Sequence, residues 1–151
     1  VHGGLNTIHL QGKYTINELN HISRNYYGIA PLEENIKNER DQPILSSINS
    51  PYWDRRLNFE WKNQLMFTIN GIDAKATTIS ELDSILSFYQ SSRIIVGHCI
   101  VDDICAGYNN KVISIDIKHG REMNSGKTKG LLIENNIFYK VDDQSRKEQI
   151  L

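Results

Sequence analysis

The 151-residue sequence has few cysteines, no long apolar run and almost no net charge. The two cysteines, Cys99 and Cys105, lack C-x-x-C spacing, so we interpret both as thiols and infer neither a disulfide framework nor a zinc knuckle. The apolar runs are too short to cross a bilayer. A formal net charge of −1 gives no general attraction to nucleic acid or to an anionic membrane. The sequence therefore predicts no nucleic-acid partner and no membrane partner.

The sequence also lacks a secretory signal, an internal repeat and a low-complexity linker. The chain opens at Val1 and not at methionine, so the lack of a secretory signal says little about the cellular compartment. Both a cytoplasmic and a periplasmic location stay open. The composition is ordinary, with 39% hydrophobic and 23% charged residues. This length and composition predict one soluble domain with a substantial core.

Two segments carry clear helical signals. Residues 15–18 and 78–81 read T-I-N-E and T-I-S-E, which are capping boxes that satisfy the orphan amides of a first helical turn. Apolar residues recur at helical spacing after each box. We predict one helix from residue 15 to a stop at Gly28 and a second from residue 78 to about residue 90.

Strand signals lie mainly in the second half of the chain. Residues 94–96, I-I-V, read as a buried strand, and residues 111–117 alternate as a second strand. Residues 130–133 and 137–141 flank Asn135-Asn136, which is a two-residue hairpin signal. The polar tail from residue 142 is expected to fray, unless the last two residues pair at a sheet edge.

Other segments are harder to assign. We predict a loop for residues 30–49, with a short solvated helix over residues 33–40 as the alternative, and a second loop after His98 that contains the turn residues Gly107 and Asn109-Asn110. Residues 57–75 are compatible with a strand or a short helix, with a turn at Asn70-Gly71.

His98 is the first candidate for a functional residue. It follows Gly97 at the carboxyl end of the predicted strand 94–96, where ligand sites of open α/β sheets gather. An imidazole there can bind a metal or a phosphoryl group, or transfer a proton. The structural alternative is a histidine bonded to a backbone carbonyl in a loop.

Three short motifs follow one another along the chain: V-H-G-G-L at residues 1–5, S-P-Y-W-D-R at 50–55 and I-V-G-H-C-I-V-D at 95–102. With V-I-S-I-D at 112–116 and G-L-L-I at 130–133, they resemble the C-terminal half of a calcineurin-like metallophosphoesterase, of the bacterial phosphoprotein-phosphatase-like branch. The resemblance covers nearly the whole chain. It implies an α/β fold that is half of a four-layer αββα sandwich, with one mixed sheet, two main helices and a C-terminal β-hairpin.

The resemblance implies roles for three residues. His2 and His98 are similar to two metal-ligand histidines of the family, and Arg55 is similar to the arginine that holds substrate phosphate in a W-x-R pattern. Arg56 is the alternative if the register shifts by one. The implied cofactors are two divalent ions of the Mn, Zn or Fe class, which share a bridging hydroxide that attacks phosphorus.

Two further residues could assist His98. Asp102 could orient its imidazole, although capping a turn is an equally good role for this aspartate. His119 could face the same cleft, although an exposed loop histidine is the simpler interpretation.

The first motifs of the family, G-D-x-H, G-D-x-x-D and G-N-H, are missing from the sequence. Residues 1–151 are therefore expected to be the C-terminal portion of a metallophosphoesterase domain, from a parent phosphatase that acts on phosphomonoesters or phosphoproteins. The chain alone is expected to hold an incomplete metal centre, or none, and to be inactive. Expected partners are a phosphorylated substrate, the missing N-terminal half and, through self-association, another copy.

Two alternatives remain open from the sequence. One is a non-catalytic interaction module on the same fold. The other is an unrelated small α/β binding domain in which His2 and His98 lie far apart.

Overall fold

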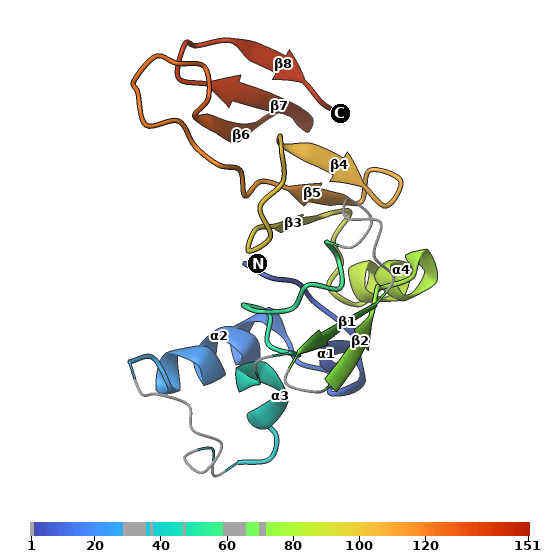
Figure 1. Ribbon diagram of the computed structural model, residues 1–151. Helices are drawn as coiled ribbons and strands as arrows, with labels where there is room; N and C mark the ends of the chain where they lie inside the picture. The colour runs from blue at the N-terminus through green and yellow to red at the C-terminus, as the bar shows by residue number, and fades with distance from the viewer. Residues whose placement is uncertain (1, 29–35, 37, 47, 59–65, 70–71) are drawn as a thin grey trace.

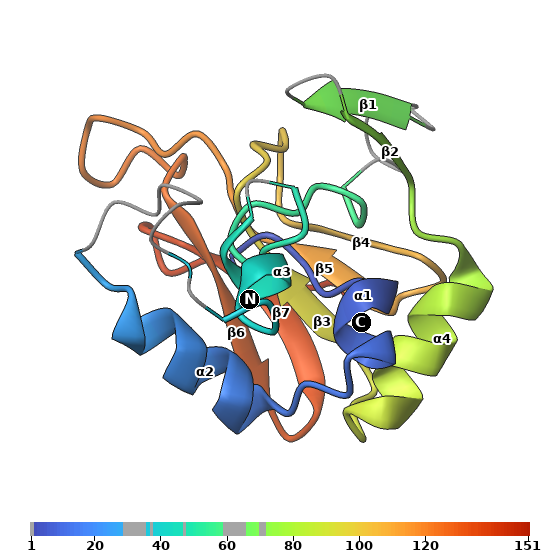
Figure 2. The ribbon, with the colours of Figure 1, turned by 90° about the horizontal axis from the view of Figure 1, so that it is seen from below.

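The computed structural model describes residues 2–28, 36, 38–46, 48–58, 66–69 and 72–151. Two ten-residue helices, α2 (Ile16–Asn25) and α4 (Ile79–Phe88), lie at one end with the short helices α1 (Thr7–Gln11) and α3 (Gln42–Leu45). Two small sheets follow one above the other in Figure 1. Seen from below, the helices lie in front of these sheets (Figure 2).

Side-chain capping starts both long helices. The Thr15 hydroxyl accepts a hydrogen bond from the Glu18 amide, and the Glu18 carboxylate accepts one from the Thr15 amide at 2.8 Å. Thr78 and Glu81 form the same pair of bonds at the start of α4. These contacts confirm the two predicted helices, although α2 and α4 end earlier than expected, at Asn25 and Phe88.

The middle sheet is mixed and has the order β3-β5-β4. Strand β3 (Ile94–Val96) pairs in parallel with β5 (Val112–Ser114), and β4 (Cys105–Gly107) pairs with β5 in the antiparallel sense. The strand predicted at 94–96 is confirmed. The strand predicted at 111–117 is shorter than expected, with Ile117 making only an isolated bridge to Val101. Strand β4 lies where a loop was predicted.

The outer sheet is antiparallel and contains β6 (Lys129–Glu134), β7 (Ile137–Asp142) and β8 (Lys147–Gln149). Asn135 and Asn136 connect β6 to β7 with φ angles of 51° and 61°, a left-handed conformation that asparagine tolerates. The expectation of a frayed tail is wrong, and the alternative of pairing at a sheet edge is confirmed, because β8 pairs with β7, the Ile150 amide donates to the Phe138 carbonyl at 2.9 Å and the Phe138 amide donates to the Leu151 carbonyl at 3.2 Å.

A third sheet, β1 (Met66–Ile69) with β2 (Ile72–Lys75), is a two-stranded antiparallel ribbon that projects at the top of Figure 2. The strand alternative for this segment is therefore confirmed for the eight residues of β1 and β2. Helix α3 likewise replaces part of the loop predicted at 30–49. Val1, the turn at Asn70-Gly71, and residues 29–35, 37, 47 and 59–65 lie outside the described part of the chain. The β3-β5-β4 sheet is the mixed sheet that was predicted, and the described residues add two antiparallel sheets, of which the β1-β2 ribbon was not part of the predicted architecture.

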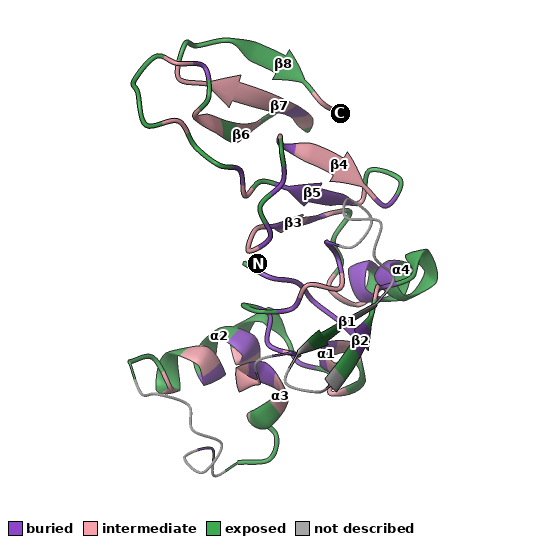
Figure 3. Ribbon diagram, viewed as in Figure 1, coloured by how far each residue is buried: buried purple, intermediate pink, exposed green. Residues whose placement is uncertain are grey.

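Two hydrophobic clusters lie between the layers, one on each side of the middle sheet. The first lies between the helices and the middle sheet, and it includes Leu82 and Ile85 of α4 with Val96 and Val112. The second lies between the two sheets, and it is formed by Val101, Ile104, Ile113, Ile117 and Phe138. Figure 3 shows β5 buried along its whole length, because successive side chains point into opposite clusters.

Apart from the β1-β2 ribbon, the described residues thus form one helical layer and two stacked sheets. The four-layer αββα arrangement stays a prediction. In the described part of the chain, no helix has both the length and the apolar character needed to span a membrane.

Candidate functional site

The candidate site is the pair formed by His2 and His98. His98 follows the carboxyl end of β3, with a left-handed φ of 65°. The Gly97 amide donates a hydrogen bond to the His2 carbonyl at 2.8 Å, and the Gly3 amide donates to the Pro51 carbonyl at 2.8 Å. These two bonds fasten the segment around His2 to the end of β3 on one side and to the loop before Trp53 on the other.

The two imidazoles meet through one nitrogen each. His98 Nδ1 lies 3.2 Å from His2 Nε2, and the ring centroids are 5.0 Å apart at an interplanar angle of 68°. A direct N–H···N hydrogen bond fits this distance. A shared metal ion fits it as well, since two nitrogens with metal bonds of about 2.0–2.1 Å and an angle of about 100° lie about 3.2 Å apart. The alternative fold with widely separated histidines is therefore wrong.

The environment of His98 favours its neutral form. Burial lowers the pKa of His98, and the charges of Arg55 and His2 lower it further, whereas Asp116 raises it. A neutral imidazole is the form that binds a metal. His98 Nε2 is buried and has no hydrogen-bond partner among the described residues. The tautomer with its proton on Nε2 leaves the Nδ1 lone pair directed toward His2.

Trp53 packs against both imidazoles. Its ring centroid lies 5.1 Å from that of His98 and 6.5 Å from that of His2, and both contacts are edge-to-face. The Ser50 carbonyl accepts from the Trp53 amide at 3.0 Å, which turns the chain at this point. Trp53 is 51% exposed, so it borders the site and is not part of the core.

Asp54 decides which arginine can serve the site. Its buried carboxylate accepts from the Arg56 amide at 2.8 Å, from Arg56 Nη1 at 2.7 Å and from Asn6 Nδ2 at 2.5 Å. Arg56 Nη2 also donates to Asn49 at 2.9 Å. The Arg56 guanidinium is therefore held inside the structure. Arg55 is half-buried and close enough to His98 to lower its pKa, and no ion pair holds it among the described residues. Arg55 is thus the better candidate for a phosphate ligand.

The structure does not bring the two assisting residues to His98. Asp102 and His119 are both exposed, and neither has a described contact with the histidine pair. The carboxylate that acts on His98 is Asp116, which sequence reasoning did not name as a site residue. The signal was available, because Asp116 follows β5, and the carboxyl ends of the parallel strands β3 and β5 meet at one edge of the sheet.

The histidine pair is not a complete metal centre by itself. Within the described ranges, no cluster of three or more His, Cys, Asp or Glu side chains is placed to hold a metal ion. Two imidazoles supply half of a four-coordinate site.

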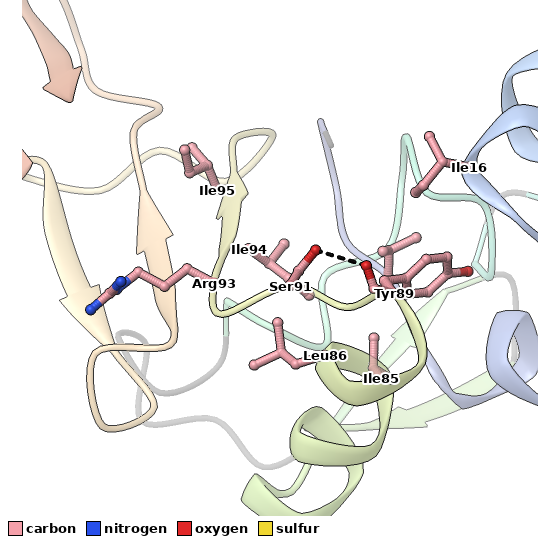
Figure 4. A pocket seen from close by; sticks show the side chains of 9 residues that line it. Ile16, Ile85, Leu86, Tyr89, Ser91, Arg93, Ile94 and Ile95 are labelled. Atoms are coloured by element: carbon pink, nitrogen blue, oxygen red, sulfur yellow. Dashed lines mark hydrogen bonds between the residues drawn. The ribbon is translucent and has the colours of Figure 1, made fainter. Parts of the chain in front are cut away.

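Two cavities lie near the helical layer. One, of about 470 Å³, is bordered by α2, α3 and residues 50–53, and Trp53 is part of its wall. The other, of about 270 Å³, lies between α4 and β3 (Figure 4). Its β3 side is formed by Arg93, Ile94 and Ile95 at the start of the strand, whereas His98 follows the end. Neither His2 nor His98 lines these two cavities, and the first is related to the pair only through Trp53, which contacts both imidazoles.

Solved structures with a similar fold are phosphatases by name. The chain matches the crystal structure of a cold-active protein-tyrosine phosphatase from the psychrophile Shewanella sp., with a TM-score of 0.73 and 21% identity. This match covers 100% of the present chain and 40% of that chain, so the present chain spans well under half of the matched structure. A mutant of a cold-active protein tyrosine phosphatase and a further structure of such an enzyme match with the same TM-score.

The other comparisons give no match. No family model matches the sequence, and no curated protein matches it. The chain therefore has a phosphatase-like fold, which is as much as 21% identity supports. Membership of the calcineurin-like family, and dependence on a metal, stay predictions.

Proposed function

We propose that His2 and His98 bind one of two divalent metal ions in a phosphoester hydrolase, in which Arg55 holds the substrate phosphate. The observation that carries this proposal is the 3.2 Å separation of His98 Nδ1 and His2 Nε2. Imidazole ligands suit ions of the Zn, Mn or Fe class. The two nitrogens come from residues 96 positions apart in the sequence, so their contact is made by the fold and is not a result of local chain connectivity.

Each residue has a separate task in this proposal. Bound divalent ions supply an activated water and Lewis acidity for the attack on phosphorus. His98, kept neutral by burial and by Arg55, presents Nδ1, and His2 presents Nε2. The Arg55 guanidinium binds the phosphate oxygens and stabilises the charge that develops on them. The substrate class is a phosphomonoester or a phosphoprotein.

Among the described residues no third metal ligand joins the histidine pair, and we propose that residues 1–151 act as the C-terminal portion of a larger phosphatase domain that supplies further ligands. The names of the structural neighbours support this proposal, as does the 40% share of the matched chain. Partners would be the complementary half of the domain and the phosphorylated substrate.

A metal titration followed by nitrogen NMR of the histidine side chains tests the proposal. We expect the NMR signals of His2 Nε2 and His98 Nδ1 to shift at a lower Zn²⁺ concentration than the signals of the other histidines. We also expect Zn²⁺ to bind at least tenfold more weakly to His98→Asn than to the unmodified chain. Asparagine tolerates the left-handed backbone at position 98, so the variant removes the ligand without straining the chain. His21→Gln changes an exposed histidine of α2 and serves as the control.

A result in which Zn²⁺ shifts His21 as much as His98, with unchanged affinity in His98→Asn, would refute the shared metal site.

An assay with p-nitrophenyl phosphate and Mn²⁺ tests the second part of the proposal. The 151-residue chain alone is expected to show little turnover. Robust turnover would contradict the idea that essential ligands come from another segment.

A further inference from the structure

The segment that carries His2 packs directly on the segment that carries Arg55. A Cβ carbon added to Gly3 would lie 2.7 Å from the Asp54 amide nitrogen and 2.9 Å from the Trp53 amide nitrogen, so the two backbones touch at this glycine. One of these segments supplies the proposed metal ligand, and the other supplies the proposed phosphate ligand. The contact between them therefore sets how far apart the two ligands lie.

The Asn6 side chain fastens the two segments together. Its Nδ2 donates to the Asp54 carboxylate at 2.5 Å and to the Asn49 carbonyl at 3.0 Å. Its Oδ1 accepts from the Ile8 amide at 2.9 Å, which caps helix α1. Asn6 is only 2% exposed, so these bonds lie inside the structure. Capping needs only Oδ1, whereas Nδ2 directs both of its protons to residues 43 and 48 positions further along the chain.

The Asp54 carboxylate is held from two sides. Asp54 is fully buried and lies between Trp53 and Arg55 in the sequence. Its carboxylate accepts from Asn6 on one side and from the amide and the guanidinium of Arg56 on the other. A buried carboxylate that loses one of its donors is strongly disfavoured, so these bonds keep the backbone in place here. They also fix the directions in which the two neighbouring side chains leave the backbone.

We propose that Asn6 is a positioning residue, which sets the spacing between the metal ligand His2 and the phosphate ligand Arg55. It does so through its bond to Asp54. The inference rests on the proposed function, because that function assigns the two ligand roles. His2 is also held to the end of β3 by the bond from the Gly97 amide to its carbonyl, in which Asn6 has no part. Loss of the Asn6–Asp54 bond should therefore displace the phosphate ligand more than the metal ligand.

A matched pair of serine variants tests the role of Asn6. Serine is itself a favourable N-cap, so Asn6→Ser keeps an acceptor for the Ile8 amide and removes the Nδ2 donor. Asn38 makes the same kind of local bond, in which its Oδ1 accepts from the Arg40 amide two residues later, but it is exposed. Asn38→Ser therefore makes the same chemical change at an asparagine that is not bonded to Asp54.

Two dissociation constants separate positioning from general stability. One is that of Zn²⁺, followed by the His2 Nε2 signal in NMR, and the other is that of methyl phosphate for the Zn²⁺-loaded chain, followed by the Arg55 Nε signal. In Asn6→Ser we expect the Zn²⁺ constant to stay within about threefold and the methyl phosphate constant to rise about tenfold, because a misplacement of about 1 Å can cost about 10²-fold. In Asn38→Ser both constants stay unchanged. Equal changes of the two constants in Asn6→Ser, or no change in either, would overturn the positioning role and leave the proposed function standing.

A second measurement needs no metal. The rings of Trp53 and His2 meet edge-to-face with centroids 6.5 Å apart, which is a contact that a nuclear Overhauser effect between their protons can report. We expect this effect to weaken in Asn6→Ser and to persist in Asn38→Ser. If it weakens while the unmodified chain binds neither Zn²⁺ nor methyl phosphate, the proposed function fails and the role of Asn6 in spacing the two segments stands. An unchanged effect would overturn the inference.

The unmodified chain decides the matter should Asn6→Ser fail to fold. The Asn6 side-chain amide protons are then expected to exchange with water at least about tenfold more slowly than those of the exposed Asn38, because buried hydrogen bonds open only with local unfolding. Exchange at equal rates would show that the bond to Asp54 does not persist in solution, and would overturn the inference.

Discussion

Protonation of His9 should make the stability of the chain fall as the pH is lowered from about 6.5 to about 4, a window that opens above the range where carboxylates titrate. His9 is fully buried in α1, and burial together with the nearby Arg56 charge lowers its pKa from 6.5 to about 4, although the backbone of Asn49 raises it in part. The Asn6 amide donates to His9 Nδ1 at 3.1 Å, so a proton on this nitrogen would bring two donors face to face.

The sign and size of the effect follow from the two pKa values. The unfolded chain binds the proton near pH 6.5 and the folded chain only near 4, so stability falls as the pH is lowered between these values. The shift corresponds to about 3 kcal/mol in total, of which about 2 kcal/mol is lost by pH 5. This is a large part of the stability of a small domain, about 5–15 kcal/mol.

Urea unfolding at pH 7, 6, 5 and 4, followed by tryptophan fluorescence, measures this loss. His9→Gln should flatten the curve, because glutamine keeps an acceptor for the Asn6 amide and takes up no proton. His98, whose pKa is also lowered, contributes with the same sign in both proteins, so the difference between them isolates His9. His21→Gln is the control. If His9→Gln loses stability between pH 7 and 4 as steeply as the unmodified chain, the reasoning is refuted.

Two further substitutions test the network beneath the site, both by urea unfolding. Asp54→Ala leaves the half-buried Arg56 charge without its carboxylate and should cost about 3–5 kcal/mol, whereas Asp83→Ala, which breaks only the exposed pair with Lys111, should cost under about 1 kcal/mol. Similar costs for the two would contradict the assigned role of Asp54. Gly3→Ala places a methyl group 2.7 Å from the Asp54 amide nitrogen and should destabilise by about 1–3 kcal/mol. Gly130→Ala, whose added carbon meets nothing nearer than 4.0 Å, should be tolerated, and equal tolerance at Gly3 would show that the backbone can move apart.

The helices were predictable because their signals are local. Thr15 with Glu18 and Thr78 with Glu81 carry the start of each helix within four residues. Helix α1 was missed because its capping box is Asn6 with His9, and histidine replaces the usual glutamate or glutamine. Strand β4 was missed because Cys-Ala-Gly has no alternation of apolar and polar residues, and its pairing with β5 depends on tertiary contacts.

The site was predictable only in part. Motif order indicated His2 and His98, but no periodicity could show that their nitrogens lie 3.2 Å apart. The W-x-R pattern favoured Arg55 over Arg56, but the sequence could not show that the buried Asp54 carboxylate binds Arg56. Asp116 was overlooked, since its proximity to His98 follows from the parallel pairing of β3 with β5.

The long sequence separation of the histidine pair has a consequence for the order of folding. The β6-β7-β8 sheet is a meander of neighbouring strands within residues 129–151, and such local contacts form early. The contact between His2 and His98 closes a loop across 96 positions, and β3 must also find β5 before Gly97 can bond to His2. We therefore expect the site to assemble late in folding, so that the His2–His98 contact would serve as a reporter of the completed packing between the N-terminal segment and the end of β3.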